Sequence, residues 1–293
     1  VSAGRDGDLW RIETRDAETG QTRRFKARMI VNAGGPWVAD ILQTKVHRNT
    51  QEKIRLVRGS HIVTRRLFDH DKCYFFQGTD GRIIFAIPYE QDFTLIGTTE
   101  AAHEDLSAKP KITPEETAYL IAFANEYLAQ DISEKDVVWT YSGVRPLYDD
   151  HAANASKVTR DYVLKLDDDG GAPVLSVFGG KITTYRELAE DALQTLDKVF
   201  PEAGGEWTRD ADLPGGDMPR ADFDGFYKGL RQDYPKLSAN LLQRLARAYG
   251  TDARRLLGQA ETDGDLGRMF GASLTETEAR YLVEVEFART ADD

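Results

Sequence analysis

The stretch Phe178-Gly179-Gly180-Lys181-Ile182-Thr183-Thr184-Tyr185 joins the end of an apolar run to the start of a helix. The run over 173–178 predicts a strand, and Thr184 followed three residues later by Glu187 is typical of a helix N-cap. Two glycines between them allow the backbone to approach a ligand, because no Cβ stands in the way. A helix N-terminus offers unpaired N–H groups and partial positive charge, which suit an anionic ligand such as a phosphate.

A nucleotide-binding P-loop is one alternative for this stretch, and the residue types exclude it. Ile182 follows the lysine where a P-loop has serine or threonine, and Leu175 stands at the position of its first glycine. A glycine-rich turn with a surface lysine stays open as the simpler interpretation.

A second strand and glycine pair occurs upstream, in Val31-Asn32-Ala33-Gly34-Gly35-Pro36. We expect a strand over 29–32 and a short helix over 37–42. Before them, apolar and polar residues alternate from Trp10 to Arg15, which predicts a hairpin with its turn at 16–20. Taken alone, the Gly34-Gly35 pair could equally be an ordinary turn between strand and helix.

The middle of the chain has the pattern of an antiparallel meander. The predicted strands are 54–63, 73–77, 82–87 and 93–97. A helix follows, because Thr113 caps it, Pro114 takes the first helical position and Glu116 completes a capping box. The apolar stripe of this helix comprises Tyr119, Leu120, Phe123, Tyr127 and Leu128.

Further strands are predicted at 137–147 and 161–166, before the strand at 173–178. The helix after Thr184 should bury one face, formed by Leu188, Leu193, Leu196 and Phe200. Beyond Pro201 the chain becomes rich in proline and glycine. Capped helices then follow at 238–249, 251–257 and 275–287. The fold class is therefore mixed, α+β or α/β, with a helical domain from about residue 210.

Composition excludes several functions. The chain has 293 residues and a net charge of −11, which argues against general nucleic-acid binding. The single cysteine, Cys73, excludes an intramolecular disulfide and a thiolate metal site, and no other metal pattern is present. A reducing compartment such as the cytoplasm is the simpler assumption. No apolar run approaches the roughly 18 residues of a membrane span.

Two arginines and one histidine are candidate site residues. Arg145 stands in Tyr-Ser-Gly-Val-Arg-Pro-Leu (141–147), held by the proline that follows, and Arg160 opens a strand. Together they could clamp a phosphate, since a guanidinium stays charged and offers paired donors. His61, flanked by Gly59-Ser60 inside a β run, is a candidate acid or base. Each of the three could instead be a solvated or structural side chain.

Taken together, these strings resemble the FAD-dependent, quinone-linked glycerol-3-phosphate dehydrogenases. The resemblance keeps the family's order and covers 27–42, 54–100, 138–150, 159–185 and, more weakly, 210–293. It implies that 1–48 and 156–209 are parts of an FAD-binding domain. It also implies that 49–155 is an inserted antiparallel β substrate domain and 210–293 a C-terminal helical domain.

The resemblance also implies a reaction and roles for the residues. The family oxidises glycerol 3-phosphate to dihydroxyacetone phosphate and passes the electrons to quinone. Arg145 and Arg160 would bind the substrate phosphate, His61 would take the hydroxyl proton, and Lys181 would stabilise the reduced flavin. The remaining residues implied to line the FAD are Ala33, Gly34, Gly35, Gly179, Gly180 and Thr184.

The family's glycine fingerprint for the FAD pyrophosphate is missing from this sequence. We therefore expect a fragment that, by itself, neither holds FAD nor oxidises substrate.

Two other functions stay open. A related amine- or amino-acid-oxidising flavoenzyme would share the fold but bind a carboxylate. A non-catalytic chain would use its helical part, 210–293, to bind a partner or a membrane. Peripheral attachment at the inner face of the cell membrane and a homodimer also stay open.

Overall fold

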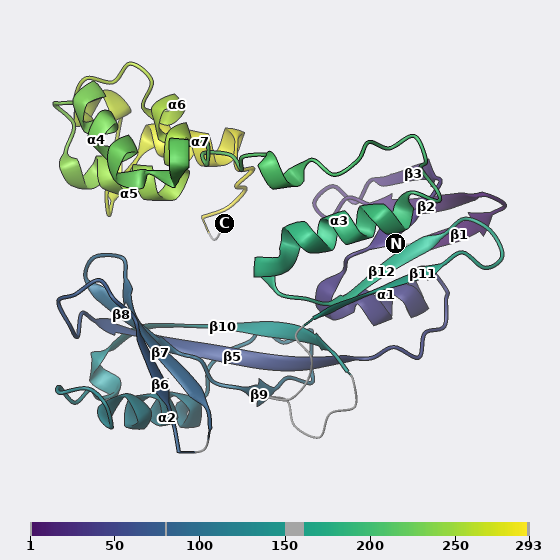
Figure 1. Cartoon of the computed structure of the whole chain (residues 1–293), viewed down its shortest axis with the longest axis horizontal. Coiled ribbons are helices and arrows are strands. Elements are labelled where there is room, and N and C mark those ends of the chain that lie inside the picture. The colour runs from purple at the N-terminus through teal and green to yellow at the C-terminus, as the bar shows by residue number, and fades with distance from the viewer. Residues whose placement is uncertain (1, 80, 150–160, 292–293) are drawn as a thin grey trace. The chain divides into compact units, whose positions relative to one another are not determined.

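The structure is a computed structural model that describes residues 2–79, 81–149 and 161–291. It divides into two compact units, Val1–Gly205 and Glu206–Asp293. Figure 1 labels the helices and strands of both. The four-part domain assignment made from the sequence stays a prediction.

The first unit begins with a three-stranded antiparallel sheet. Its strands are β1 (Ser2–Asp6), β2 (Leu9–Arg15) and β3 (Thr22–Ala27), in that order. The predicted hairpin is confirmed as β2 and β3. Strand β1 was not expected, because its residues lack an alternating apolar pattern. Buried Trp10 donates a hydrogen bond from Nε1 to the carbonyl oxygen of Pro173 at 2.7 Å, which links this sheet to the next.

A second sheet carries both glycine turns. It consists of β11 (Tyr162–Asp167), β12 (Val174–Gly179) and β4 (Ile30–Asn32) in that order, with β4 parallel to β12. The turn η1 (Gly35–Trp37) and helix α1 (Val38–Thr44) follow β4, as the sequence predicted. Side chains of α1 pack with those of β12 in one buried cluster that contains Val38, Leu42, Val174 and Phe178.

Helix α3 (Tyr185–Leu196) exists, but two predictions about it are wrong. The chain enters through the turn η4 (Ile182–Thr184), where Thr184 has ψ 13° instead of the extended backbone of a capping residue. Its hydroxyl donates to the carbonyl oxygen of Lys181 at 3.0 Å and caps nothing. Leu193 is 46% exposed, because the buried side of the helix carries Glu190, which pairs with Arg186 at 2.8 Å.

The largest sheet of the first unit is antiparallel and confirms the predicted meander. Its strand order is β10-β5-β8-β7-β6, and β9 also pairs with β5. The bounds are β5 Ile54–Arg65, β6 Tyr74–Gln77, β7 Ile83–Tyr89, β8 Phe93–Gly97, β9 Ala101–Ala102 and β10 Val137–Tyr148. The turn η2 (Glu134–Asp136) leads into β10. Strands β5 and β10 are the longest and run side by side in Figure 1.

Helix α2 (Pro114–Asn125) covers one face of this sheet (Figure 1). Its capping box is confirmed: Thr113 accepts from the Glu116 backbone N–H at 3.2 Å, and Glu116 accepts from that of Thr113 at 2.9 Å. Leu120 and Phe123 of the predicted stripe are buried against the sheet, whereas Tyr127 stays 44% exposed at the edge. The opposite face of the sheet is the one that matters for the site.

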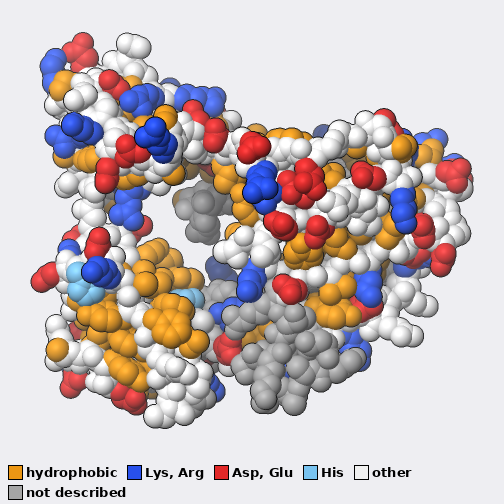
Figure 2. Space-filling view, viewed as in Figure 1, with side chains coloured by type: hydrophobic (Ala, Val, Ile, Leu, Met, Phe, Trp, Pro, Cys, Tyr) orange, Lys and Arg blue, Asp and Glu red, His pale blue; other side chains and the backbone are white. Residues whose placement is uncertain are grey.

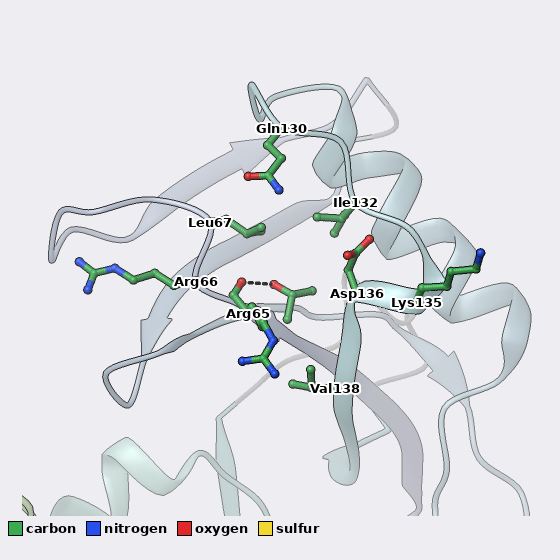
Figure 3. Close-up of a pocket in the computed structure, with 9 residues that line it drawn as sticks. Arg65, Arg66, Leu67, Gln130, Ile132, Lys135, Asp136 and Val138 are labelled. Carbon is green, nitrogen blue, oxygen red and sulfur yellow. Dashed lines mark hydrogen bonds between the residues drawn. The ribbon is translucent and has the colours of Figure 1, made fainter.

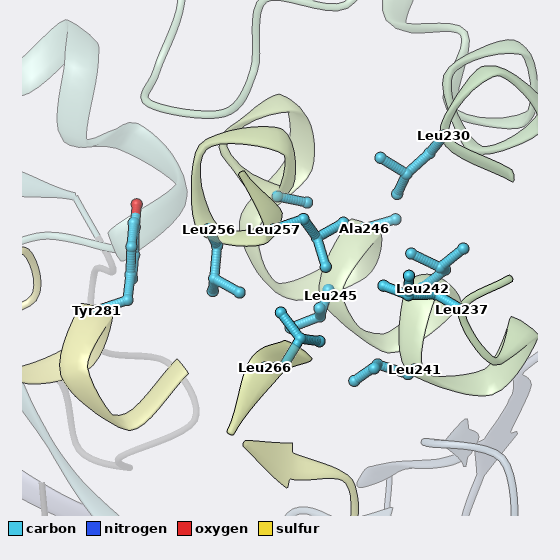
Figure 4. Packing of buried hydrophobic residues seen from close by; sticks show 11 residues of the cluster. Leu230, Leu237, Leu241, Leu242, Leu245, Ala246, Leu256, Leu257, Leu266 and Tyr281 are labelled. Atoms are coloured by element: carbon cyan, nitrogen blue, oxygen red, sulfur yellow. The ribbon is translucent and has the colours of Figure 1, made fainter. Parts of the chain in front are cut away.

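The second unit is helical with one small hairpin. Its helices are α4 (Phe223–Asp233), α5 (Ala239–Tyr249), α6 (Ala253–Leu257) and α7 (Glu276–Glu284), and its strands are β13 (Met269–Gly271) and β14 (Leu274–Thr275). The sequence predicted three of these helices and missed α4. Figure 4 shows the buried core, in which leucines of α4, α5 and α6 meet Leu266 and Tyr281.

None of the helices in the described ranges combines the length and the apolar character needed to cross a bilayer.

Candidate active site

The sheet face opposite α2 gathers the candidate residues of β5, β8 and β10. His61 lies opposite Tyr141 of β10 and Gly97 of β8. Because successive side chains of a strand point to opposite faces, and Ile62 packs against α2, His61 points away from the helix. This face is open and apolar over β6 and β7, where Phe75 and Phe85 are exposed, and Figure 2 shows hydrophobic side chains gathered over these strands.

The ring of His61 is held by its neighbours on that face. A Cβ placed on Gly97 would lie 2.2 Å from its Cδ2, so the imidazole lies directly over the glycine backbone. Tyr141 stacks on the ring with centroids 4.8 Å apart and an interplanar angle of 9°. Among the described residues, the buried Nδ1 of His61 has no hydrogen-bond partner. The ring therefore keeps a nitrogen that other protein groups do not occupy.

Burial, and then the nearby positive charge of Arg145, lower the pKa of His61 below its ordinary value of 6.5. The imidazole is consequently neutral at pH 7. A neutral imidazole can accept a proton, whereas a protonated one cannot.

Arg145 lies on the same face, opposite Val57 in the β5–β10 register. Its guanidinium lies across Gly59, where a Cβ would be 2.6 Å from Nη2. Nη2 donates to the hydroxyl of Thr98 at 3.1 Å, and Nη1 lies 3.8 Å from a carboxylate oxygen of Glu100. The side chain as a whole is 32% exposed and its Nη1 is buried, so an anion would meet the remaining part of a cation that is already oriented.

The two glycine turns lie at the carboxyl ends of the parallel strands β4 and β12, the usual place for ligands in such sheets. Gly35, Gly179 and Gly180 have positive φ angles of 53°, 75° and 99°. Residues other than glycine rarely adopt such a backbone conformation. Buried Asn32 fixes the first turn, because its Nδ2 donates to the Val38 carbonyl at 2.9 Å. The turn η1 lies close to both β10 and β12.

Strand β10 connects the glycine turns to Arg145. A Cβ on Gly179 would lie 3.2 Å from the backbone nitrogen of Tyr148, the last residue of β10. Arg145 comes three residues earlier, which is about 10 Å along an extended strand. The second glycine turn and the candidate phosphate-binding cation therefore belong to one neighbourhood.

Apolar side chains are exposed around the glycine turns. Val31 of β4 is 51% exposed, Trp37 of η1 is 50% exposed, and Ile182 of η4 is 88% exposed. Exposed apolar side chains next to glycine backbone fit a flat, largely apolar ring such as a flavin. The residues present are thus suited to one part of an FAD.

For the other predicted site residues in the described ranges, the structure gives exposure but no contact that indicates a role. Ala33 is exposed beside the first turn, and Lys181 is exposed at the start of η4. Thr184 is half-buried. Arg160 lies outside the described residues. The roles of all these residues stay predictions.

Sequence reasoning missed the residues that hold Arg145 and His61. Gly97, Thr98 and Glu100 form these contacts; Gly97 is the last residue of β8, and the other two lie within three residues after it. A polar Thr-Thr-Glu run immediately after a buried strand was the available signal.

The described residues also line a pocket of about 190 Å³ at the other end of β5 and β10. Figure 3 shows the charged ends of Arg66 and Lys135 directed away from its centre. Arg66 instead donates to the carbonyl oxygens of Phe68 and Asp69. The pocket contains none of the predicted site residues, so it is not the candidate site.

Comparison with known proteins identifies the family of this chain. Residues 1–186 match the family model described as FAD dependent oxidoreductase. Over its whole length, the chain is 45% identical to the D-erythritol 1-phosphate dehydrogenase of Brucella abortus (strain 2308). It is 43% identical to the aerobic glycerol-3-phosphate dehydrogenase of Escherichia coli (strain K12). It spans 58% of the length of each relative.

A solved structure is similar as well. The glycerol-3-phosphate dehydrogenase of Bacillus halodurans, complexed with FAD, superposes with a TM-score of 0.71 at 26% identity. The likeness covers 88% of this chain and 50% of that one.

Proposed function

The chain belongs to the FAD dependent oxidoreductase family, and from this premise we propose that it serves the oxidation of sn-glycerol 3-phosphate to dihydroxyacetone phosphate. One observation carries the proposal: a partly buried arginine, Arg145, lies beside a neutral histidine, His61, on one open sheet face. The arginine suits a phosphate and the histidine suits a hydroxyl proton. A substrate that carries both groups fits this pair.

Arg145 binds the phosphate in this proposal. A guanidinium stays charged at every physiological pH and offers paired donors that match phosphate oxygens. Nη2 of Arg145 donates a hydrogen bond to Thr98, and this bond keeps the two-pronged guanidinium, the fork, oriented across Gly59. Arg160 is proposed as a second phosphate ligand on the resemblance alone.

His61 accepts the proton of the C2 hydroxyl. When bound, FAD supplies the two-electron oxidant that takes the hydride from C2. Loss of the hydroxyl proton to neutral His61 and loss of the hydride together leave the ketone. Arg145 also stabilises negative charge that develops near the reacting oxygen.

The glycine turns are proposed to hold the FAD. Gly34, Gly35, Gly179 and Gly180 would bring backbone against it, with Ala33 and Thr184 beside them. Lys181 would place a positive charge next to the ring and favour its reduced, anionic form. The domain assignment 1–48, 49–155, 156–209 and 210–293 belongs to the same proposal.

The electron acceptor is proposed to be a quinone, with the protein in the cytoplasm at the inner face of the membrane. Both statements rest on the resemblance to quinone-linked dehydrogenases. Reduction of a water-soluble quinone analogue by the complete protein and substrate tests the first.

A second candidate substrate is D-erythritol 1-phosphate, the compound named for the 45% identical relative. It offers the same two groups, a phosphate and a carbinol, on a longer carbon chain.

A substrate panel tests the proposed function. The complete protein is supplied with sn-glycerol 3-phosphate, D-erythritol 1-phosphate, unphosphorylated glycerol or sarcosine, and kcat/KM is measured for each. One of the two phosphorylated polyols should exceed glycerol and sarcosine by at least about one hundredfold, since charge-assisted phosphate contacts supply about 3 kcal/mol or more. Faster oxidation of sarcosine would show an amine-oxidising enzyme instead.

A substitution tests the role of Arg145 separately. Arg145→Lys keeps the charge and removes the fork, so kcat/KM for the phosphorylated substrate should fall at least about tenfold, near 1.4 kcal/mol. The control is Arg24→Lys, an exposed arginine that pairs with Glu13 on the β2–β3 hairpin. Parental kcat/KM in Arg145→Lys means that this arginine is structural.

A further inference from the structure

A buried polar network lies behind the candidate site, on the face of the large sheet that α2 covers. Its centre is Glu116, whose side chain is 12% exposed. One carboxylate oxygen, Oε2, accepts from the Thr113 backbone at 2.9 Å and from Nη2 of Arg58 at 2.8 Å. These two contacts are the helix cap and an ion pair.

The other oxygen, Oε1, reaches the sheet. It accepts from the hydroxyl of Thr99 at 2.7 Å and from that of Ser60 at 3.3 Å. The Thr99 hydroxyl in turn accepts from the Ser60 backbone N–H at 3.0 Å, so it both donates and accepts. Ser60 also shares a hydrogen bond with Ser142 of β10 at 2.9 Å. A helix cap alone needs none of these contacts.

Thr99 is the neighbour of Thr98, the residue that holds the guanidinium of Arg145 on the opposite face. Both residues follow the end of β8, and their hydrogen bonds place them on different sides of the sheet: Thr99 donates to Glu116, whereas Thr98 accepts from Arg145. The segment after β8 therefore has Thr99 fixed on the helix side and Thr98 in contact with Arg145 on the open side.

We infer that Glu116 is a positioning residue for substrate binding, which fixes Thr99 and, through Thr98, sets the orientation of Arg145. The inference rests on the proposed function, because it takes Arg145 as the phosphate ligand. Displacement of the Thr98–Thr99 segment would leave the guanidinium fork misaligned with the phosphate, without removing any group from the reacting atoms.

The Glu116 carboxyl keeps its negative charge inside the buried network. Burial raises the pKa of this carboxyl, but hydrogen bonds from Thr99, Thr113 and Arg58, with the charge of Arg58, outweigh burial and hold the pKa below its ordinary value. The carboxylate is therefore ionised at neutral pH and accepts strong hydrogen bonds.

Thr99 offers the sharpest test, because its replacement leaves both contacts of Oε2 unchanged. Thr99→Val keeps the shape and removes the hydroxyl, whereas Thr99→Ser keeps the hydroxyl. In the complete protein, we expect Thr99→Val to raise the KM for the phosphorylated substrate and the inhibition constant for inorganic phosphate at least fivefold. The kcat should stay within about threefold, and Thr99→Ser should stay within twofold of the parent in all three values.

Glu116→Gln should act in the same direction as Thr99→Val. Its matched control is Glu115→Gln, an exposed glutamate in the same helical turn that should leave KM unchanged. Combined with Arg145→Lys, the Thr99→Val change should add little, because both act on one contact.

Several outcomes would overturn the inference. A Thr99→Val protein that melts at lower temperature but keeps its KM and phosphate inhibition would show a purely structural network. Equal damage from Thr99→Ser and Thr99→Val would show that the hydroxyl is irrelevant. Failure of the proposed function is distinguishable, since the unsubstituted protein would then show no preference for phosphorylated substrates.

Discussion

Gly97→Ala is the substitution whose effect follows most directly from the geometry. Gly97 lies under the ring of His61, and its φ is outside the left-handed region, so alanine is not strained by the backbone. The new methyl group would lie 2.2 Å from Cδ2 of His61 and 2.8 Å from Nε2. Tyr141 of β10 stacks on the ring, whereas Gly97 belongs to β8 on the other side of β5, so the stacked ring opposes a retreat of the imidazole from Gly97.

The size of the displacement sets the size of the effect. Ordinary contact begins at 3.4 Å, so the imidazole must retreat by about 1.2 Å from its position at 2.2 Å. A misplacement of about 1 Å at a reacting group costs roughly one hundredfold in rate, near 2.7 kcal/mol. We therefore expect the rate of flavin reduction by substrate to fall about one hundredfold. Substrate affinity should change less, because Arg145 keeps its contacts.

The assay is anaerobic stopped-flow reduction of the bound flavin in the complete protein. Gly4→Ala is the matched control: Gly4 also lies in a strand, and a Cβ there meets nothing within 4 Å. Circular dichroism melting separates loss of fold from loss of rate. A Gly97→Ala protein that reduces flavin at the parental rate would refute the assignment of His61 as the proton acceptor.

Three further predictions use other parts of the site. Because burial and the charge of Arg145 lower the pKa of His61 below 6.5, and the reaction needs its neutral form, the fall of kcat/KM towards acid pH should have its midpoint below pH 6.5. A midpoint above pH 7 contradicts this. Lys181→Met should slow flavin reduction by roughly one hundredfold, about 2.7 kcal/mol, and lower the flavin midpoint potential. If only KM rises, Lys181 is a phosphate ligand. The chain of 293 residues by itself should purify without FAD and show negligible dehydrogenase activity, since its sequence lacks the glycine fingerprint; a yellow protein with stoichiometric FAD speaks against this.

Local signals in the sequence were sufficient for much of the fold. The capping box of Thr113 and Glu116 specified the start of α2, because both partners lie within one helical turn. The strands of the meander were predicted from alternation and from turn residues between them. Such signals depend on neighbours in the chain, so no knowledge of tertiary contacts is needed.

Features that depend on contacts between residues distant in sequence could not be predicted from such local signals. Thr184 matched a capping pattern, yet the turn η4 before it gave the residue a backbone that cannot cap. The apolar residue Leu193 was expected to be buried, but it is exposed, and Glu190 is buried on the inner side of the helix instead. Propensity and periodicity are weak evidence when tertiary packing decides.

The sequence predicted which residues belong to the candidate site, but not how they are arranged in space. His61 and Arg145 lie 84 positions apart in sequence, and their meeting depends on the register between β5 and β10. A shift by one residue would send one of them to the face that α2 covers. Gly97 ends a third strand, β8, and Thr98 follows it; the polar run after this strand marked the place, but the contacts depend on how β8 pairs with β5.

The central claim is that Arg145 and His61 act together on a phosphorylated polyol. Its most direct test is the substrate dependence of flavin reduction, measured without oxygen in the complete protein and in Arg145→Lys. We expect sn-glycerol 3-phosphate or D-erythritol 1-phosphate to bleach the flavin in the parent, and Arg145→Lys to need about tenfold more substrate for half-maximal rate. Bleaching by neither compound, or an unchanged half-saturating concentration in Arg145→Lys, would contradict it.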